Sequence, residues 1–195
     1  MCVIIVKPAG VKVPEISVIS AAMAANPDGF GLAVSEGGQL KIYHSMDRGQ
    51  MLKIYASKVS ENSAAVFHAR IATAGSVSVR NCHGFPVRGL GEPCAFFHNG
   101  VLSINAREDM TDSETFLHDI YEPAAALGEV YGERAINAVI GSSKFAFIHA
   151  SGRIRTYGDF QEVNGVLFSN LYFCTQKSYK PAPRRFGWER YAYLY

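Results

Sequence analysis

The chain opens with MCVIIV at residues 1–6, a cysteine followed by a short, continuous apolar run. A run of β-branched residues of this length indicates a buried strand. Cys2 has a small side chain, so we expect Met1 to be removed after synthesis, which leaves Cys2 as the terminal residue. Such a cysteine carries a thiol and an α-amine, with ordinary pKa values of roughly 8.5 and 8. The amine can accept the thiol proton, and no histidine is then needed as a base. The plainer interpretation of Cys2 is a small core residue.

Composition limits the classes of protein to which the chain can belong. Its 195 residues suit a single domain spanning residues 1–195, and 48% hydrophobic with 18% charged residues is a globular composition. The net charge of +2 is too small to indicate nucleic-acid binding. The basic, aromatic segment 180–190 is either a solvated tail or a contact surface. No signal peptide or membrane-spanning run is expected, and the four cysteines match no zinc pattern. We therefore expect a cytoplasmic protein with free thiols and no metal or organic cofactor.

Strands and helices are predicted in blocks along the chain. The predicted strands are 2–6, 29–35, 39–43, 64–71, 93–98, 144–150 and 153–157, with one or two more within 165–173. The predicted helices are 14–26, 50–59, one opened by a capping box at 111–114, and 131–140. Residues 72–91 are predicted to be irregular, and a loop this long is usually functional. Blocks of this kind, without strict βαβ alternation, favour an α+β fold of antiparallel sheet with helices outside.

Four short segments carry polar residues of chemical interest. They read FHARIATAG at 67–75, NCH at 81–83, FHNGVL at 97–102 and DSE at 112–114. Alternation along the strand that contains the first segment places His68 and Arg70 on one face.

Together with Cys2, these segments resemble the class II glutamine amidotransferases, an N-terminal-nucleophile (Ntn) hydrolase family. That family opens with Met-Cys-Gly-Ile and then carries His-Thr-Arg-aromatic-Ala-Thr-x-Gly, Asn-Ala-His, His-Asn-Gly-(Ile/Val) and an acid in Asp-(Ser/Thr)-Glu. DGFGLAV at 28–34 is also similar to a family segment. The resemblance covers residues 2–116. It implies a four-layer αββα Ntn-hydrolase sandwich of two antiparallel sheets, and hydrolysis of L-glutamine to glutamate and ammonia.

The residues themselves fit the needs of a glutaminase. Arg70 offers a bidentate, permanently charged fork for the substrate carboxylate, and Asp112 offers acceptor oxygens for its ammonium. The Asn99 side chain and the Gly100 N–H can stabilise the oxyanion that forms when Cys2 attacks the amide. By resemblance, Thr73 and His83 border the glutamine pocket.

Each residue also has a structural interpretation. Arg70 could form a structural ion pair, Asn99-Gly100 could be a hairpin turn, and Asp112 could serve only to cap its helix. The remaining residues include His68 and His98, expected to be partly buried with their hydrogen bonds satisfied, and Cys82, Cys94 and Cys174, expected to be buried small residues.

Departures from the family pattern leave alternatives open. Val3 replaces a glycine that leaves room beside the thiol, and we expect the valine to narrow that space. Ile71, Ala69 and Ala74 replace an aromatic residue, a threonine and a histidine. The chain could therefore be another Ntn amidohydrolase or a non-catalytic Ntn-fold binding or assembly protein. A weaker alternative is a metal site built from His68, Cys82, His83, Cys94 and His98. Family members normally pass ammonia to a synthase domain, so we expect a separate synthase as the partner.

Overall fold

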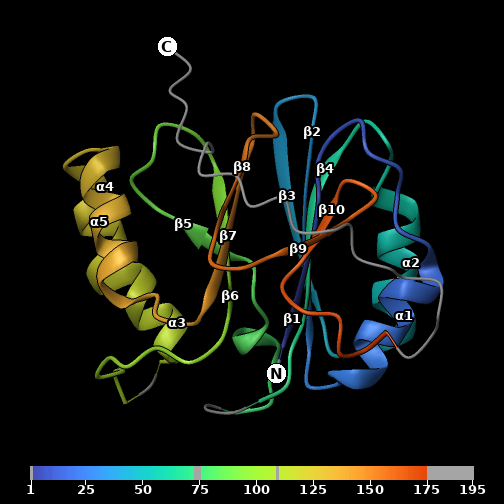
Figure 1. Cartoon of the computed structure of the whole chain (residues 1–195), viewed down its shortest axis with the longest axis horizontal. Coiled ribbons are helices and arrows are strands. Elements are labelled where there is room, and N and C mark those ends of the chain that lie inside the picture. Colours follow the sequence, from blue (N-terminus) through green and yellow to red (C-terminus); the bar gives the residue numbers. More distant parts are fainter. Residues whose placement is uncertain (1, 73–75, 109, 175–195) are drawn as a thin grey trace.

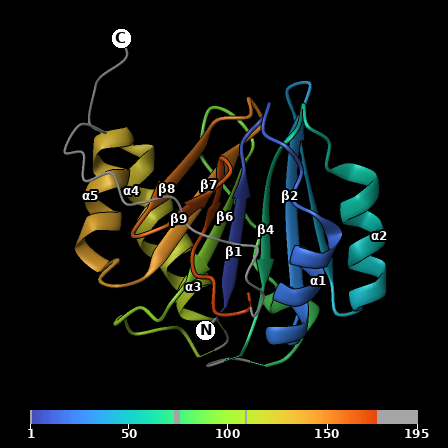
Figure 2. The same ribbon diagram turned by 45° about the vertical axis from the view of Figure 1, so that its right-hand side comes forward.

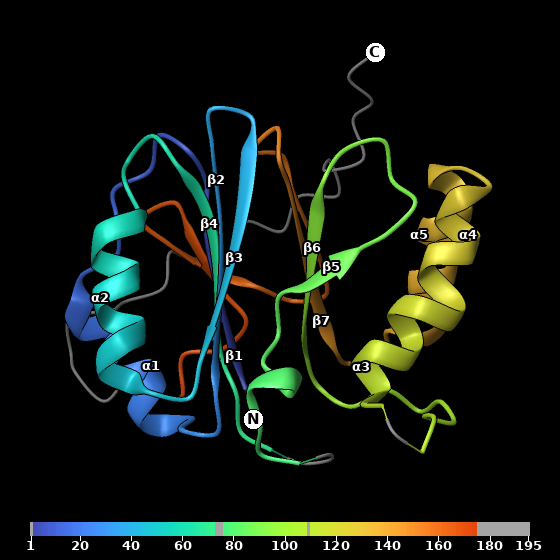
Figure 3. The ribbon, with the colours of Figure 1, turned by 180° about the vertical axis from the view of Figure 1, so that it is seen from behind.

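The computed structural model describes residues 2–72, 76–108 and 110–174 of the chain. Two antiparallel sheets lie face to face, and helices cover the outer face of each sheet (Figure 1). Viewed from behind, the two groups of helices stand on opposite sides of the molecule (Figure 3). The order of layers is therefore helix, sheet, sheet, helix, which is the αββα sandwich expected from the sequence.

The first sheet has six strands in the order β3-β2-β4-β1-β10-β9, with β1 near the middle. Helices α1 (Ile16–Ala25) and α2 (Arg48–Lys58) cover its outer face (Figure 2). The strands are β1 (Val3–Lys7), β2 (Phe30–Glu36), β3 (Gln39–Ser45), β4 (Ala64–Ala69), β9 (Gln161–Val163) and β10 (Val166–Phe168).

The second sheet has four strands in the order β5-β6-β7-β8. A largely aromatic core joins it to its helices and includes Phe96, Phe116, Phe145 and Phe147. The strands are β5 (Phe85–Val87), β6 (Cys94–Asn99), β7 (Lys144–His149) and β8 (Ile154–Tyr157). The helical segments are α3 (Asp112–Thr115), the π-helical η2 (Phe116–Tyr121), α4 (Glu122–Ala126) and α5 (Glu129–Val139); a 3-10 turn, η1 (Val79–Asn81), precedes β5.

Alanine and larger aliphatic side chains, together with Phe97, fill the space between the two sheets. Val3 and Ile5 of β1 pack in the core beneath α1 and α2, whereas Ile4 and Val6 belong to the core between the sheets. Successive side chains of a strand point to opposite faces. The alternation therefore directs Cys2, two residues before Ile4, toward the space between the sheets. The inter-sheet core consists of Ile4, Val6, Ala33, Ala64, Val66, Ala95, Phe97, Ala146 and Ile148.

Most predicted elements are confirmed, including the capping box. Thr111 Oγ1 accepts from the Glu114 N–H at 3.2 Å, and Glu114 Oε2 accepts from the Thr111 N–H at 3.0 Å. Two strands were not predicted. The first, β5, lies inside the segment expected to be irregular and contains Pro86, which is tolerated because β5 is an edge strand. The second, β9, starts at Gln161, before the predicted strand region.

None of the helices in the described part of the chain has the length and hydropathy needed to cross a membrane.

Candidate active site

The ends of four strands meet at one edge of the sandwich, at the foot of β1 and β6 in Figure 1. The strands are the start of β1 and the ends of β4, β6 and β10. Alternation along them directs four side chains toward the space between the sheets, because Ile4, Val66, Phe97 and Leu167 already pack there. These four side chains are Cys2, Arg70, Asn99 and Ser169. Three of them were predicted as site residues.

The Cys2 thiol is held against the turn that follows β4. The Ile71 N–H donates to Cys2 Sγ at 3.4 Å, and Sγ lies 3.5 Å from the Ile71 carbonyl oxygen. Burial raises the pKa of the Cys2 thiol, while the hydrogen bond from Ile71 and the charge of Arg70 act in the opposite direction. The thiol is therefore mostly protonated at neutral pH, and a nucleophilic role requires a base.

Arg70 is buried within reach of this thiol. Its backbone is fixed by two hydrogen bonds, from the Arg70 N–H to Gly29 O at 2.9 Å and from the Asp28 N–H to Arg70 O at 3.0 Å. Its guanidinium donates to Ser76 O at 3.0 Å. Asp28 Oδ2 accepts from the Ala72 N–H at 2.8 Å, which secures the same turn. The Asp28-Gly29 pair thus holds the segment that carries both Arg70 and the partner of the Cys2 thiol.

Asn99 and Gly100 end β6 without forming a hairpin. The chain continues from them to α3, so the hairpin interpretation is wrong. Asn99 is 3% exposed, and its Nδ2 lies 2.8 Å from Ser169 Oγ. Gly100 has φ +143°, and a Cβ at this position would overlap the side chain of Ser143. Glycine is required here both for its conformation and for this close approach.

Asp112 begins α3 and secures the loop after Gly100. Its Oδ2 accepts from the Leu102 N–H and its Oδ1 from the Ser113 N–H, each at 2.8 Å. The local role at the helix start is therefore present. Ser113 Oγ also donates to Asp112 Oδ1, at 3.2 Å. A carboxylate has about four lone-pair sites, so these three bonds leave acceptor capacity for another ligand.

His83 is buried and packed among other histidines. Its Nδ1 accepts from the His98 N–H at 3.2 Å, and its ring stacks on that of His68 with centroids 4.1 Å apart. Burial, with His68 and His98 nearby, holds the pKa of His83 well below its usual value. Gly31 lies beneath the His83 carbonyl, where any Cβ would overlap it. These contacts give His83 a packing role, and its place beside a glutamine pocket stays a prediction.

Of the remaining sequence predictions, some are confirmed, some are wrong, and one falls on a residue that the structure does not describe. Thr73 lies outside the described residues. Val3 was expected to narrow the space beside the thiol, but its side chain is fully buried in the core beneath α1 and α2. His68 was expected to have its hydrogen bonds satisfied, yet neither ring nitrogen has a partner among the described residues. Cys82 and Cys94 are buried as expected, whereas Cys174 is partly exposed. Among the described residues, no group of three or more His, Cys, Asp or Glu side chains is arranged to hold a metal ion.

Sequence reasoning missed Ser169 and Asn170, which follow β10. Ser169 Oγ accepts from the Ile4 N–H at 2.8 Å and also contacts Asn99, and Asn170 Nδ2 donates to Cys2 O at 2.8 Å. No motif precedes or follows this pair in the sequence, so only the pairing of β10 with β1 could have placed it here.

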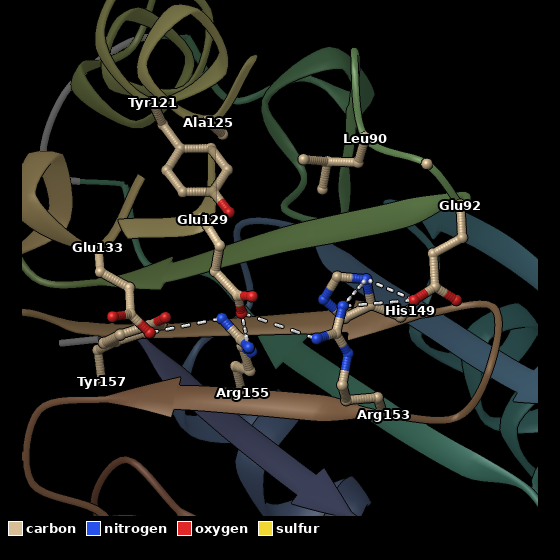
Figure 4. A pocket seen from close by; sticks show the side chains of 11 residues that line it. Leu90, Glu92, Tyr121, Ala125, Glu129, Glu133, His149, Arg153, Arg155 and Tyr157 are labelled. Carbon is tan, nitrogen blue, oxygen red and sulfur yellow. Dashed lines mark hydrogen bonds and ion pairs between the residues drawn. The ribbon is translucent and has the colours of Figure 1, made fainter. Parts of the chain in front are cut away.

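A separate pocket of about 340 Å³ lies between β8 and the helices α4 and α5 (Figure 4). The pocket lies at the end of β7 that carries His149. Lys144, at the opposite end of β7, pairs with Asn99 of the candidate site. Arg153 pairs with Glu92 at 3.4 Å, and Arg155 pairs with Glu133 at 3.5 Å. These arginines are matched by glutamates, so the charges of the pocket are largely neutralised internally.

Comparison with known proteins bears on the fold. No protein-family model matches the chain, and no curated protein matches it either. Solved structures do match it, and two of them are informative about the fold. One is described as the allosteric regulatory enzyme of purine biosynthesis (TM-score 0.62, 16% identity, 86% of this chain and 41% of that one). The other is the glutamine phosphoribosylpyrophosphate amidotransferase of B. subtilis (TM-score 0.64, 14% identity, 93% of this chain and 44% of that one).

The fold is that of the class II, Ntn amidotransferases. This chain spans less than half the length of each of these two structures. Identities of 14% and 16% show the fold alone, so the reaction must be argued from the candidate site.

Proposed function

We propose that the chain hydrolyses L-glutamine to glutamate and ammonia, with Cys2 as the nucleophile once Met1 has been removed. The observation that carries the proposal is the meeting of Cys2, Arg70 and Asn99 at one edge of an Ntn-type sandwich. A thiol, a fixed cation and a buried amide, drawn from three strands, match the groups that amide hydrolysis of an amino acid requires.

The first step uses the α-amine of Cys2 as its base. Burial keeps the thiol protonated at rest, and the amine of the same residue can take that proton directly or through a water. The sulfur then attacks the amide carbon of glutamine, and the electron pair of the C=O bond moves to oxygen. The Asn99 amide and the Gly100 N–H would donate to this oxyanion, and each donor contributes about 3–4 kcal/mol to such a step.

The second half of the reaction releases the products. The C–N bond breaks, and the nitrogen leaves as ammonia after taking the proton held by the α-amine. Water then attacks the γ-glutamyl thioester, which yields glutamate and regenerates the thiol. Arg70 would bind the α-carboxylate throughout, and Asp112 the α-ammonium.

The alternative is that another amide is the substrate. The positions of Val3 and Ile71 weaken the sequence evidence for this alternative. The alternative rested on Val3 and Ile71, and the Val3 side chain points into the outer core. Ile71 contacts the thiol through its backbone N–H and carbonyl, which any residue at that position could supply.

The test is a steady-state assay of glutamate and ammonia release with the wild-type protein and Cys2→Ala. We expect equal amounts of the two products from the wild type and loss of at least about 10³-fold in kcat/KM in the variant. Cleavage of other amides with no cleavage of glutamine would replace the substrate. Equal turnover by the variant would remove the mechanism.

We further propose that the ammonia is delivered to a separate synthase. The test is the addition of candidate acceptor proteins during the assay. An acceptor that raises glutamine turnover and lowers the free ammonia supports the proposal, and constant turnover with all released ammonia free in solution counts against it.

A further inference from the structure

Ser169 forms the last rung between β10 and β1. It lies opposite Ile4, because Phe168 pairs with Ile5. The Ser169 N–H donates to Ile4 O at 2.9 Å, and the Ile4 N–H donates to Ser169 Oγ at 2.8 Å. The hydroxyl oxygen therefore replaces the backbone carbonyl that would normally accept at such a rung.

The same hydroxyl meets the amide of Asn99. Ser169 Oγ and Asn99 Nδ2 are 2.8 Å apart, and the two residues are 2% and 3% exposed. In this orientation Ser169 Oγ accepts two hydrogens, and its own hydroxyl hydrogen has no acceptor among the described residues. Asn99 Oδ1 is likewise buried without a partner there. A buried donor and a buried acceptor are thus both unsatisfied within one residue pair, which is costly.

A half-turn of the Asn99 amide gives both of these groups a partner, and leaves the two Nδ2 hydrogens free to bind another acceptor. Oδ1 then faces Ser169 and accepts its hydroxyl hydrogen, while Ser169 Oγ still accepts from the Ile4 N–H. The two ends of an asparagine amide are nearly identical in size, so their hydrogen-bond partners decide which end points where. After the turn, Nδ2 occupies the former place of Oδ1, facing away from Ser169.

We propose that Ser169 is a positioning residue that donates its hydroxyl hydrogen to Asn99 Oδ1 and thereby directs the Asn99 N–H groups toward the oxyanion. The inference rests on the proposed function for the identity of that oxyanion. Without the hydroxyl, the amide can turn its oxygen toward the developing negative charge, which would repel it.

One short segment, Ser169-Asn170, is hydrogen-bonded both to the strand that carries the nucleophile and to the oxyanion donor. Ser169 holds the Ile4 N–H and the Asn99 amide, and its neighbour Asn170 donates to Cys2 O at 2.8 Å. The chain after β10 therefore fixes the backbone of Cys2 and the amide of Asn99 relative to each other. In the proposed reaction it contacts neither the thiol sulfur nor the substrate.

The kinetic experiment compares Ser169→Ala and Ser169→Thr with the wild type. We expect Ser169→Ala to lower kcat for glutamine by about 10- to 100-fold with KM nearly unchanged, because the oxyanion exists only after attack. Ser169→Thr keeps the hydroxyl and should recover most of kcat. The matched control is Ser35→Ala, which removes another buried hydroxyl. Ser35 Oγ donates to Ala150 O at 2.8 Å, outside the candidate site, so this variant should leave kcat unchanged.

A double variant tests whether Ser169 acts through Asn99. In an Asn99→Ala background, Ser169→Ala should cause no further loss of kcat. An unchanged kcat in the single variant, or an equal further loss in the double variant, would overturn the inference.

An NMR measurement separates this inference from the proposed function. The Asn99 ¹³Cγ resonance, assigned by its absence in Asn99→Ala, reports a hydrogen bond accepted by Oδ1. We expect Ser169→Ala to move it upfield and Ser35→Ala to leave it in place. If the wild type has no glutaminase activity but the resonance moves, the proposed function fails and the Ser169–Asn99 bond stands. A resonance that does not move overturns the assignment of that bond.

Discussion

At the scale of single residues, the candidate site depends on a cation and a thiol that approach from adjacent strands. Val3 pairs with Ala69, so Cys2 and Arg70 continue from the paired ends of β1 and β4. The charge of Arg70 opposes the rise in the pKa of the Cys2 thiol that burial causes, without overcoming it. The first prediction follows from the shape of the guanidinium.

Arg70→Lys should raise KM for glutamine by about 10-fold or more with a smaller effect on kcat, because lysine cannot bind a carboxylate through two parallel bonds. The measurement is a pair of saturation curves for glutamine and for 4-aminobutanamide, which lacks the α-carboxylate. With 4-aminobutanamide, Arg70→Lys and the wild type should have similar KM values. An equal loss with both substrates would mean that Arg70 acts on the structure of the turn and not on the carboxylate.

Residues with local motifs were predictable at this scale, and residues without them were not. Cys2, Arg70 and Asn99 were found because each stands in a short pattern that also suits its chemistry. Ser169 stands in no such pattern, and its position depends on the antiparallel pairing of β10 with β1, between residues 165 apart in the sequence. The packing of Val3 was misjudged because the face of β1 that meets the helices could not be deduced from a continuous apolar run.

At the scale of elements, glycine positions decide whether loops can approach the strands. Gly100→Ala should lower kcat by about 100-fold and reduce the free energy of unfolding by about 1–3 kcal/mol, since the new Cβ overlaps Ser143 and φ is +143°. Gly91→Ala is the matched control because nothing lies within 4 Å of its Cβ position and its φ is not positive. Activity assays and urea unfolding measure both variants, and similar behaviour of the two would refute the steric argument.

The far end of β1 is closed by a buried lysine. Lys7 Nζ donates to three carbonyl oxygens, those of Ser60 at 2.5 Å, Glu61 at 2.7 Å and Ser63 at 2.7 Å. Lys7→Met should lower the free energy of unfolding by about 2–4 kcal/mol, because three carbonyl oxygens, of which that of Ser63 is in a buried residue, lose their donor. Lys53→Met, on the exposed side of α2, should change it by less than about 0.5 kcal/mol. A small effect at Lys7 would show that water replaces the ammonium there.

Element boundaries were predictable where neighbouring residues determine them, and not where pairing with a distant strand does. The capping box at Thr111 was predictable because its bonds link residues three apart. The strand β5 was not, since it has only three residues, contains proline and is defined by its pairing with β6. The strand β4 ends at Ala69, two residues earlier than predicted, because Arg70 and the next residues turn to meet Asp28 and Cys2.

At the scale of the whole molecule, buried histidines couple stability to pH. Burial lowers the pKa of His68 to about 3 and that of His98 to about 4, well below the ordinary 6.5 that they regain on unfolding. The unfolded chain therefore binds more protons below pH 6.5, and stability falls as the pH drops from 6.5 toward 4. Between pH 6.5 and 5 the expected loss is about 2 kcal/mol for each histidine.

Urea unfolding at pH 7.0, 6.0 and 5.0 measures this dependence. His68→Leu should flatten it by removing one of the buried histidines that take up a proton on unfolding, whatever its effect on absolute stability. A free energy of unfolding that stays constant from pH 7 to 5 would mean that these histidines take up protons as readily in the folded protein as in the unfolded chain.

The proposed glutaminase reaction requires that Cys2 become a terminal nucleophile in a pocket shaped for glutamine, within the αββα fold of the Ntn amidotransferases. Its most direct test is the intact mass of the purified protein before and after treatment with 6-diazo-5-oxo-norleucine, a reactive glutamine analogue. We expect loss of Met1 and a single adduct on the peptide that begins with Cys2, with no adduct on Cys2→Ala. Retention of Met1 with no adduct, or labelling of Cys82, Cys94 or Cys174 instead, would contradict it.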